Sequence, residues 1–291
     1  MIRAITALKA FATLLPAVLL ASCSPLVVVN ALVPDDSYRG ETDIAYGPEA
    51  RHKLDLYQPA NGQVSKGLIF FVYGGSWKTG TRTNYRFVGE AFASRGYTVV
   101  VPDYRLYPEV RFPAFVEDAA LALAWTRRNL DPGVAERTLL MGHSAGAHIA
   151  ALLALDRRYL DAVDVAPEAV SGWVGLAGPY SFDLLKYRSI RPIFEGTGPP
   201  EQTRPITFAH AGAPPALLIH GTDDGTVRPE NSQMLAARLT ELGVEARYLP
   251  LVDVGHSGIL VSLSEPFESR APVIETTLTF FDKLEPRAKA E

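Results

Sequence analysis

The sequence predicts a single α/β domain built on a mostly parallel, doubly wound sheet of eight strands with an antiparallel start. Short apolar runs alternate with segments of helical spacing, as expected of parallel strands covered by helices. The run 67–73 is apolar throughout, which is typical of a strand buried on both faces. A Gly-x-Ser-x-Gly turn at residues 142–146 joins another apolar run to a helix.

The predicted elements follow one another in a regular order. The first two strands, 43–46 and 52–57, read as an antiparallel hairpin. The other expected strands are residues 67–73, 97–102, 138–141, 172–176, 216–220 and 246–251. Helical spacing marks residues 85–94, 113–129, 149–155, 232–242 and 273–284. The segment 178–213 is rich in proline and glycine and weakly periodic, so we interpret it as a small lid over a pocket.

Composition limits the class of protein. The 291 residues are 47% hydrophobic and 21% charged, an ordinary globular balance with enough apolar residues for a core. The formal net charge is −4 and there is no basic run, which argues against a nucleic-acid partner.

The N-terminus has the features of an export signal. Arg3 and Lys9 precede an apolar stretch, residues 10–21, that ends in small residues before the only cysteine, Cys23. The sequence Leu-Ala-Ser-Cys at 20–23 resembles the lipobox of bacterial lipoproteins. That resemblance implies cleavage before Cys23 and attachment of acyl chains to it.

An uncleaved membrane anchor is the alternative for this segment. Its apolar core is shorter than the ~20 residues that a span needs, unless residues 26–33 extend it past Pro25. We therefore expect a signal peptide at 1–22, a tether at 23–39, a catalytic domain at 40–285 and a tail at 286–291.

The Gly-x-Ser-x-Gly turn places Ser144 between an apolar strand and a helix. So sharp a turn needs small residues on either side, which Gly142 and Gly146 supply. The N-terminal N–H groups of the helix would face an oxyanion formed at this position. The pattern predicts that Ser144 is a nucleophile, with a simple helix N-cap as the alternative.

A nucleophilic serine needs a base, and the base needs a carboxylate to orient it. His256 is the candidate base, because it follows the last strand in a glycine-flanked loop. Asp223 and Asp224 both follow the strand 216–220, so position alone leaves the acid open between them; the other one is expected to cap the helix that starts near Pro229. The other histidines are interpreted as structural or surface groups: His52, His143, His148, His210 and His220. No histidine pair has metal-ligand spacing with an acidic third residue, so we assign no metal.

A glycine pair, Gly74 and Gly75, follows the strand 67–73. An oxyanion hole needs backbone N–H groups that are free to face the substrate, and glycines permit this. The second donor in such sites is the N–H of the residue after the nucleophile, here Ala145.

Together these motifs resemble the bacterial α/β-hydrolase esterases of the carboxylesterase group that includes hormone-sensitive-lipase-like and kynurenine-formamidase-like enzymes. The resemblance covers about residues 40–285 and includes LDLYQP at 54–59, DYRLYPE at 103–109 and HGTDD at 220–224. It implies the α/β-hydrolase fold, with Ser144 as nucleophile, Asp224 as orienting acid and His256 as base.

The same resemblance maps the family's His-Gly-Gly-x-Trp oxyanion loop onto residues 73–77. It implies that the backbone groups of Gly75, Ser76 and Ala145 are the donors. Tyr73 departs from the family pattern, which has histidine there, and this leaves the anchoring of the loop open.

The implied activity is that of a serine hydrolase that cleaves a small-molecule carboxylic ester through an acyl-enzyme, without a cofactor. The alternatives are an amide or formamide hydrolase on the same triad, arylformamidase- or peptidase-like, and a catalytically silent binding lipoprotein. The lipobox implies export and lipid anchoring to a bacterial membrane. The acyl and alcohol groups are not readable from the sequence.

Overall fold

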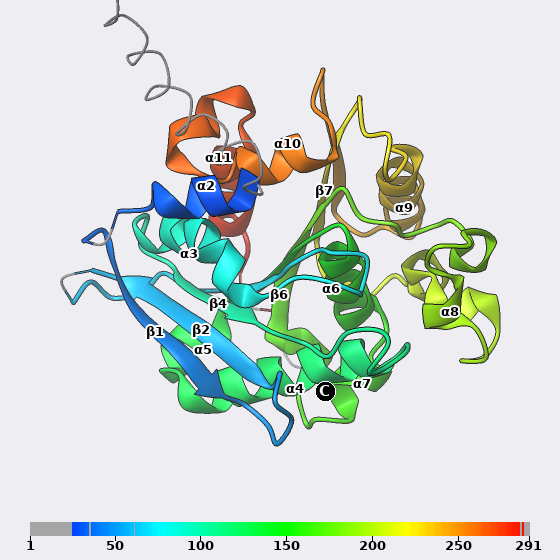
Figure 1. The fold of residues 1–291 in the computed structure, drawn as a ribbon, viewed down its shortest axis with the longest axis horizontal. Helices are drawn as coiled ribbons and strands as arrows, with labels where there is room; N and C mark the ends of the chain where they lie inside the picture. Colours follow the sequence, from blue (N-terminus) through cyan, green and yellow to red (C-terminus); the bar gives the residue numbers. More distant parts are fainter. Residues whose placement is uncertain (1–24, 35, 61, 286, 288–291) are drawn as a thin grey trace, which may run out of the picture.

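A computed structural model describes residues 25–34, 36–60, 62–285 and 287. Its strands are β1 (Tyr38–Ala45), β2 (Lys53–Pro59), β3 (Leu68–Val72), β4 (Thr98–Pro102), β5 (Thr138–His143), β6 (Val170–Leu176), β7 (Ala216–Gly221) and β8 (Ala246–Leu251). In these residues they form one eight-stranded sheet in the order β1-β2-β4-β3-β5-β6-β7-β8 (Figure 1). Strand β2 runs antiparallel to β1 and β4, and the remaining neighbours are parallel. The predicted mostly parallel sheet with an antiparallel start is confirmed.

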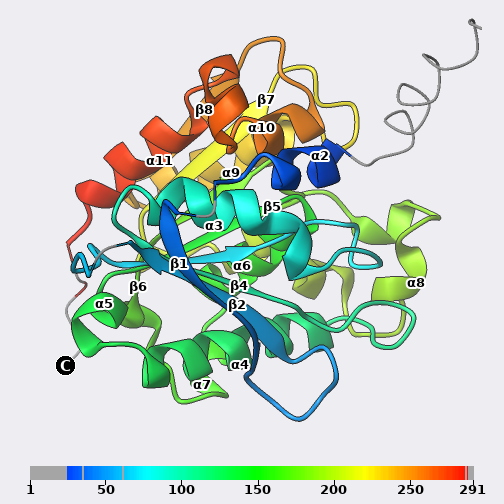
Figure 2. The same ribbon diagram turned by 60° about the vertical axis from the view of Figure 1, so that its left-hand side comes forward.

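Helices cover both faces of the sheet. They are α2 (Pro25–Ala31), α3 (Arg86–Ala93), α4 (Ala114–Asn129), α5 (Pro132–Glu136), α6 (Ala145–Leu155), α7 (Arg158–Asp161), α8 (Arg191–Phe194), α9 (Glu230–Glu241), α10 (His256–Val261) and α11 (Val273–Asp282). Short 3₁₀ turns are η1 (Arg82–Tyr85), η2 (Pro167–Ala169), η3 (Leu184–Lys186), η4 (Pro200–Thr203), η5 (Pro205–Phe208) and η6 (Glu265–Arg270). Figure 2 shows α3 and α11 on one side of the sheet and α4 on the other.

The central strands carry the core. Every residue of β3, β5, β6 and β7 is buried, as expected for parallel strands with helices on both faces. The edge strand β1 is almost wholly exposed. It begins at Tyr38, five residues before the predicted start, because its polar residues 38–43 give no apolar signal from which a strand can be predicted.

The segment interpreted as a tether is partly folded against the domain. Helix α2 lies beside α3 and η1, and its Val29 is buried. The side chain of Asn30 donates to the carbonyl of Thr83 (2.7 Å) and accepts from the N–H of Phe87 (3.2 Å). The predicted signal peptide and Cys23 lie outside the described residues. Among the described helices, none combines the length and the apolar character needed to cross a bilayer.

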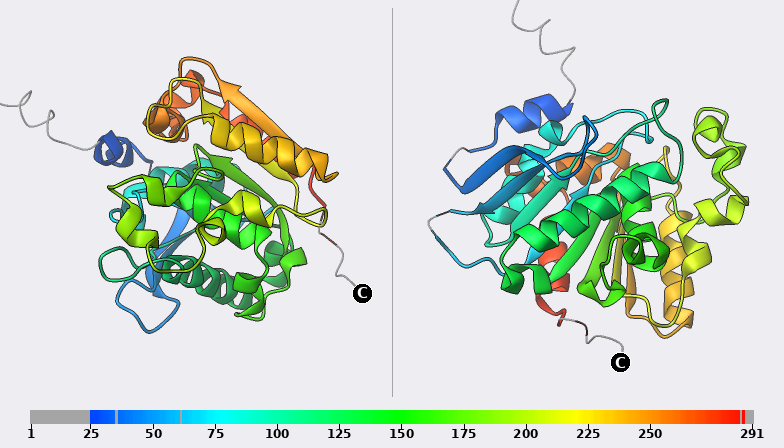
Figure 3. Two further views of the ribbon diagram at one scale, coloured as in Figure 1. Left: turned by 90° about the vertical axis from the view of Figure 1, so that its right-hand side faces the viewer. Right: turned by 90° about the horizontal axis from the view of Figure 1, so that it is seen from below.

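The segment 178–213 forms short turns around α8 and projects from one end of the molecule (Figure 3). It is joined to α6 by His148, whose ring Nε2 donates to the carbonyl of Thr203 (2.8 Å). This is the segment that the sequence predicts as a lid.

Candidate active site

Strand β5 and helix α6 meet at Ser144 in a sharp turn. Ser144 has φ 55° and ψ −121°, a backbone conformation that side-chain-bearing residues rarely adopt. A Cβ at Gly142 would lie 2.3 Å from the carbonyl oxygen of Gly146, and one at Gly146 would lie 2.0 Å from that of Val72. Only glycine fits at both positions, so the motif is required by the close approach of neighbouring backbone.

The structure brings the three predicted triad residues together. The Nδ1 of His256 lies 2.7 Å from Oδ2 of Asp224, and its Nε2 lies 2.9 Å from Oγ of Ser144. Because a carboxylate only accepts, Nδ1 carries the proton and Nε2 is left to accept from the serine hydroxyl. This is the arrangement in which a histidine takes the proton of an attacking serine.

Asp224, and not Asp223, contacts the histidine. Its Oδ1 accepts from the N–H groups of Thr226 (2.9 Å) and Val227 (2.8 Å). Burial alone would raise the pKa of Asp224, but hydrogen bonds from His220, His256 and the Val227 N–H hold that pKa well below its usual range. The carboxylate is therefore charged and fixed on both oxygens.

The expectation that the unused aspartate caps the following helix is wrong. Helix α9 starts after Pro229 without a side-chain cap. Asp223 is exposed and accepts only from the neighbouring Thr222 hydroxyl (3.3 Å) in the side-chain contacts of the described residues. Its side chain lies in the turn before α9 and does not reach the helix.

A second histidine, which sequence reasoning missed, holds the acid. His220 is fully buried, and its Nε2 lies 3.1 Å from Oδ2 of Asp224 and 2.9 Å from the carbonyl of Val227. Both partners only accept, so Nε2 carries a proton, and in the neutral ring Nδ1 accepts from the Ser232 hydroxyl at 2.7 Å. The available signal was a lone polar residue at the end of the apolar run 216–219, four positions before the acid.

Two further histidines near the site are buried and neutral. His143 donates from Nε2 to the carbonyl of His256 (3.1 Å), and burial lowers its pKa to about 3. Burial likewise lowers the pKa of His148 to about 4. In the described part of the chain, no group of three or more His, Cys, Asp or Glu side chains could hold a metal ion.

The backbone around Ser144 offers two hydrogen-bond donors. Ala145 is the first residue of α6, so its N–H has no partner within the helix. Within the described residues, the N–H of Ser76 makes no backbone hydrogen bond. Both residues line the cavity beside Ser144, whereas Gly75 does not line it and its carbonyl accepts from Lys78 and Thr79.

The cavity beside Ser144 encloses about 140 Å³. Its lining is mainly apolar and comes largely from the predicted lid segment: Ser76, Trp77, Ser144, Ala145, Pro179, Phe182, Leu184, Tyr187, Ser189, Ile190, Thr226 and Val227. It is small compared with the roughly 300–1,000 Å³ of cavities that enclose drug-sized ligands.

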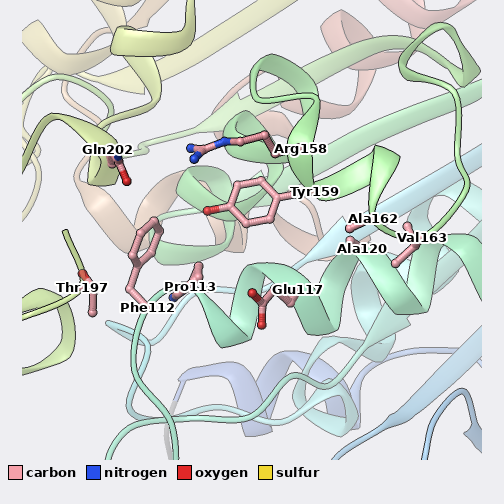
Figure 4. A pocket seen from close by; sticks show the side chains of 10 residues that line it. All are labelled: Phe112, Pro113, Glu117, Ala120, Arg158, Tyr159, Ala162, Val163, Thr197 and Gln202. Atoms are coloured by element: carbon pink, nitrogen blue, oxygen red, sulfur yellow. The ribbon is translucent and has the colours of Figure 1, made fainter. Parts of the chain in front are cut away.

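A larger cavity, of about 250 Å³, lies between α4, α7 and the segment 178–213 (Figure 4). Phe112 and Tyr159 project into it, with Glu117 and Arg158 nearby. Arg158 is held by its neighbour Asp156 through a 2.6 Å ion pair. None of the triad residues lines this cavity, so the chemistry belongs to the smaller one.

The chain is similar in sequence to known proteins. Residues 54–187 match the model of the BD-FAE family. Over 261 residues the chain is 29% identical to the probable isoprenylcysteine alpha-carbonyl methylesterase ICMEL1 of Arabidopsis thaliana, covering 79% of this chain and 55% of that protein. The chain thus spans about half the length of the curated relatives that it matches.

Solved structures give the same fold. Esterase B from Lactobacillus rhamnosis superposes with a TM-score of 0.73 at 22% identity, covering 92% of this chain and 94% of that chain. The Thermogutta terrifontis esterase Est2 with bound propionate superposes with a TM-score of 0.68 at 22% identity, covering 88% and 98%. The chain therefore has an α/β-hydrolase fold, and it is similar in sequence to proteins named as esterases.

Proposed function

We propose that the protein hydrolyses carboxylic esters, with Ser144 as nucleophile, His256 as base and Asp224 as orienting acid. The observation that carries the proposal is the unbroken chain of hydrogen bonds, at 2.9 and 2.7 Å, that ends at a serine facing a cavity. The sequence relatives are named as esterases, which supports the same conclusion.

The proposed reaction has two halves. Ser144 Oγ attacks the ester carbonyl while His256 Nε2 takes its proton, and the carbonyl oxygen becomes an oxyanion facing the N–H groups of Ser76 and Ala145. Collapse expels the alcohol, which takes the proton from His256. Water then gives a proton to His256 and attacks the acyl-enzyme, and the second collapse returns that proton to Ser144 and releases the carboxylic acid.

We also propose that the acyl group is short. The cavity beside Ser144, which Trp77 and Leu184 help to line, has a volume of only about 140 Å³ and so leaves little room for a long acyl chain. The structures of Thermogutta terrifontis Est2 with propionate and butyrate are consistent with this size class.

The test is a panel of p-nitrophenyl esters of rising acyl length, run beside N-formylkynurenine. We expect kcat/KM to be highest for acetyl to butyryl esters and to fall steadily for longer chains. Faster turnover of N-formylkynurenine than of any ester would favour the formamide hydrolase. No turnover of any substrate by folded protein would favour a silent binding protein.

We propose that the protein is exported and held at a bacterial membrane by lipid on Cys23. The sequence around Cys23 supports this, as does the helix that follows it closely. Val27 and Val28 of α2 are 50% and 37% exposed, and Leu32, directly after the helix, is 52% exposed, which makes an apolar surface close in sequence to the site of acylation. A lipid surface would cover these side chains.

A further inference from the structure

The oxyanion loop, defined as residues 74–81, runs from the end of β3 to η1. Its backbone is strained, because Ser76 and Trp77 have φ of 53° and 59°. Two consecutive residues with side chains in the left-handed region persist only where the surroundings hold them. Ser76 is exposed and itself offers the N–H that faces the site. Within the loop, Trp77 is buried against His148 and Phe194, and its carbonyl accepts from the N–H of Tyr107 (2.9 Å). A second set of fixed contacts lies at the two ends of the loop.

Both ends of the loop bind one buried carboxylate, that of Asp103 just after β4. Before the loop, the hydroxyl of Tyr73 donates to Oδ1 of Asp103 at 2.6 Å. After the loop, the backbone N–H of Arg82 donates to the same oxygen at 2.7 Å, and its guanidinium Nη1 donates to Oδ2 at 2.6 Å. All three residues are buried, so water does not compete for these bonds.

The side chain of Tyr73 also supports the loop directly. Its ring lies under Gly80, where an added Cβ would be 2.7 Å from ring carbon Cε2. Arg51 joins the same two groups, because its Nη2 donates to the Tyr73 hydroxyl (2.9 Å) and to the carbonyl of Gly80 (2.8 Å). The hydroxyl of Tyr104 donates to the carbonyl of Tyr73 at 2.9 Å.

We propose that Tyr73 is a positioning residue for catalysis: through Asp103 it fixes the loop that places the Ser76 N–H on the oxyanion. This inference rests on the proposed ester hydrolysis and extends it. Tyr73 does not line the cavity beside Ser144 and its hydroxyl binds Asp103, so it acts only through the loop. The chain has tyrosine at position 73, where the family pattern has histidine. The tyrosine hydroxyl reaches the Asp103 carboxylate from the end of β3, so this residue can anchor the loop.

The variant that tests this is Tyr73→Phe, which keeps the ring and removes only the hydroxyl. Tyr85→Phe is the matched control, because the Tyr85 ring stacks on Tyr73 at 5.1 Å and its hydroxyl makes no hydrogen bond to the described residues. We expect Tyr73→Phe to lower kcat about tenfold or more with KM changed less than about threefold, because a misplaced donor weakens only the transition state. Tyr85→Phe should stay within about twofold of wild type for both constants.

Inhibition by a trifluoromethyl ketone separates a positioning role of Tyr73 from a purely structural one, because a purely structural role would leave the inhibition constant Ki unchanged. The hemiketal oxygen of this inhibitor occupies the oxyanion position, so its Ki for Tyr73→Phe should rise by the same factor as kcat/KM falls. A Tyr73→Phe enzyme with unchanged kcat, or with a loss confined to KM or to thermal stability, would overturn the proposal. So would a loss of kcat with no change in Ki. Inactive wild-type protein would instead count against ester hydrolysis itself.

Asp103→Asn is the second variant, and its folding is checked first by circular dichroism. It keeps the side-chain shape and removes the charge that both ends of the loop share. We expect its kcat to fall at least as far as that of Tyr73→Phe, and the double variant to lose less than the product of the two single losses, because both changes break the same contact. Fully multiplicative losses would contradict a shared role.

Discussion

His220 donates from Nε2 to Oδ2 of Asp224, the same oxygen that accepts from His256. Two histidines therefore bind one carboxylate oxygen, from opposite directions along the chain: one from the end of β7 and one from the start of α10. The second histidine has no contact with Ser144 among the hydrogen bonds of the described residues, so it acts on the acid alone.

Replacing His220 by leucine should slow the reaction. The change removes a charge-assisted hydrogen bond of about 1.5–3 kcal/mol from Asp224. At about 1.4 kcal/mol per tenfold in rate, we expect kcat/KM to fall roughly 10- to 100-fold if that stabilisation is felt in the transition state. His210→Leu, at an exposed position in the segment 178–213, is the control and should have no effect. Unchanged kcat/KM in folded His220→Leu would contradict the positioning role.

Substitution of the two neighbouring aspartates, Asp223 and Asp224, should have very different effects on kcat. Asp224→Asn removes the charge that orients and stabilises the histidine, and the corresponding change in a serine protease costs on the order of 10⁴-fold in kcat. Asp223→Asn alters an exposed side chain and should leave kcat within about twofold of wild type. Steady-state kinetics on one short ester decide between them. Equal losses of kcat in the two variants, or a larger loss in Asp223→Asn, would contradict the assignment of Asp224 as the orienting acid.

The free energy of unfolding should fall as the solution becomes mildly acidic. In the fold, burial lowers the pKa of His143 to about 3 and that of His148 to about 4, whereas an unfolded histidine titrates near 6.5. Below pH 6.5 the unfolded chain binds protons at these histidines and the native state does not. The free energy of unfolding therefore declines with falling pH until the pH reaches the folded pKa values. Each histidine contributes a slope of up to about 1.4 kcal/mol per pH unit.

Urea unfolding at several pH values between 7.5 and 4.5 measures this slope. His148→Gln is the informative variant, because glutamine keeps a donor for the Thr203 carbonyl and removes the titrating group. We expect the free energy of unfolding of the variant to fall less steeply with decreasing pH than that of wild type. The difference in slope should correspond to about one fewer proton taken up on unfolding. Parallel curves for the two proteins would show that His148 does not contribute.

If lipid is attached to Cys23, membrane association of the protein depends on that single thiol. Cys23→Ala should abolish incorporation of labelled palmitate and release the protein from membranes, because each buried CH₂ of an acyl chain contributes about 0.8 kcal/mol to anchoring. Ester hydrolysis should persist, since the triad lies in the folded domain. A wild-type chain that takes up no palmitate and has its mature N-terminus elsewhere would refute the lipid anchor.

The sheet was predictable because its central strands are buried on both faces and read as apolar runs. The predicted run 67–73 becomes β3, Leu68–Val72, and the run 216–220 becomes β7, Ala216–Gly221. Strand β1 was predicted only from residue 43, and helix α2, in the segment interpreted as a tether, was not predicted. The first is exposed and polar, and the second is a short helix whose docking depends on tertiary contacts of Val29 and Asn30.

Ser144 and His256 were predictable from chain order and glycine-rich turns, and the choice of Asp224 over Asp223 came from the family resemblance, but the partners of the triad were not predictable. The polar residue at the end of the run 216–219 marks His220 as a candidate, but the sequence does not show that its ring turns toward Asp224, because that contact depends on how β7 ends. The direction of Tyr73 is set by Asp103, thirty positions away and just after the neighbouring strand β4. Long-range polar contacts of this kind appear only when the strands have been placed side by side.

Labelling with a fluorophosphonate probe, followed by mass mapping of the modified peptide, tests the central claim most directly. The probe requires an activated serine, so the account predicts a single adduct on Ser144 in folded wild-type protein. Ser144→Ala should take up no probe and His256→Ala should label far more slowly, while both remain folded. An adduct on another serine, or ester hydrolysis by Ser144→Ala within tenfold of wild type, would contradict the account.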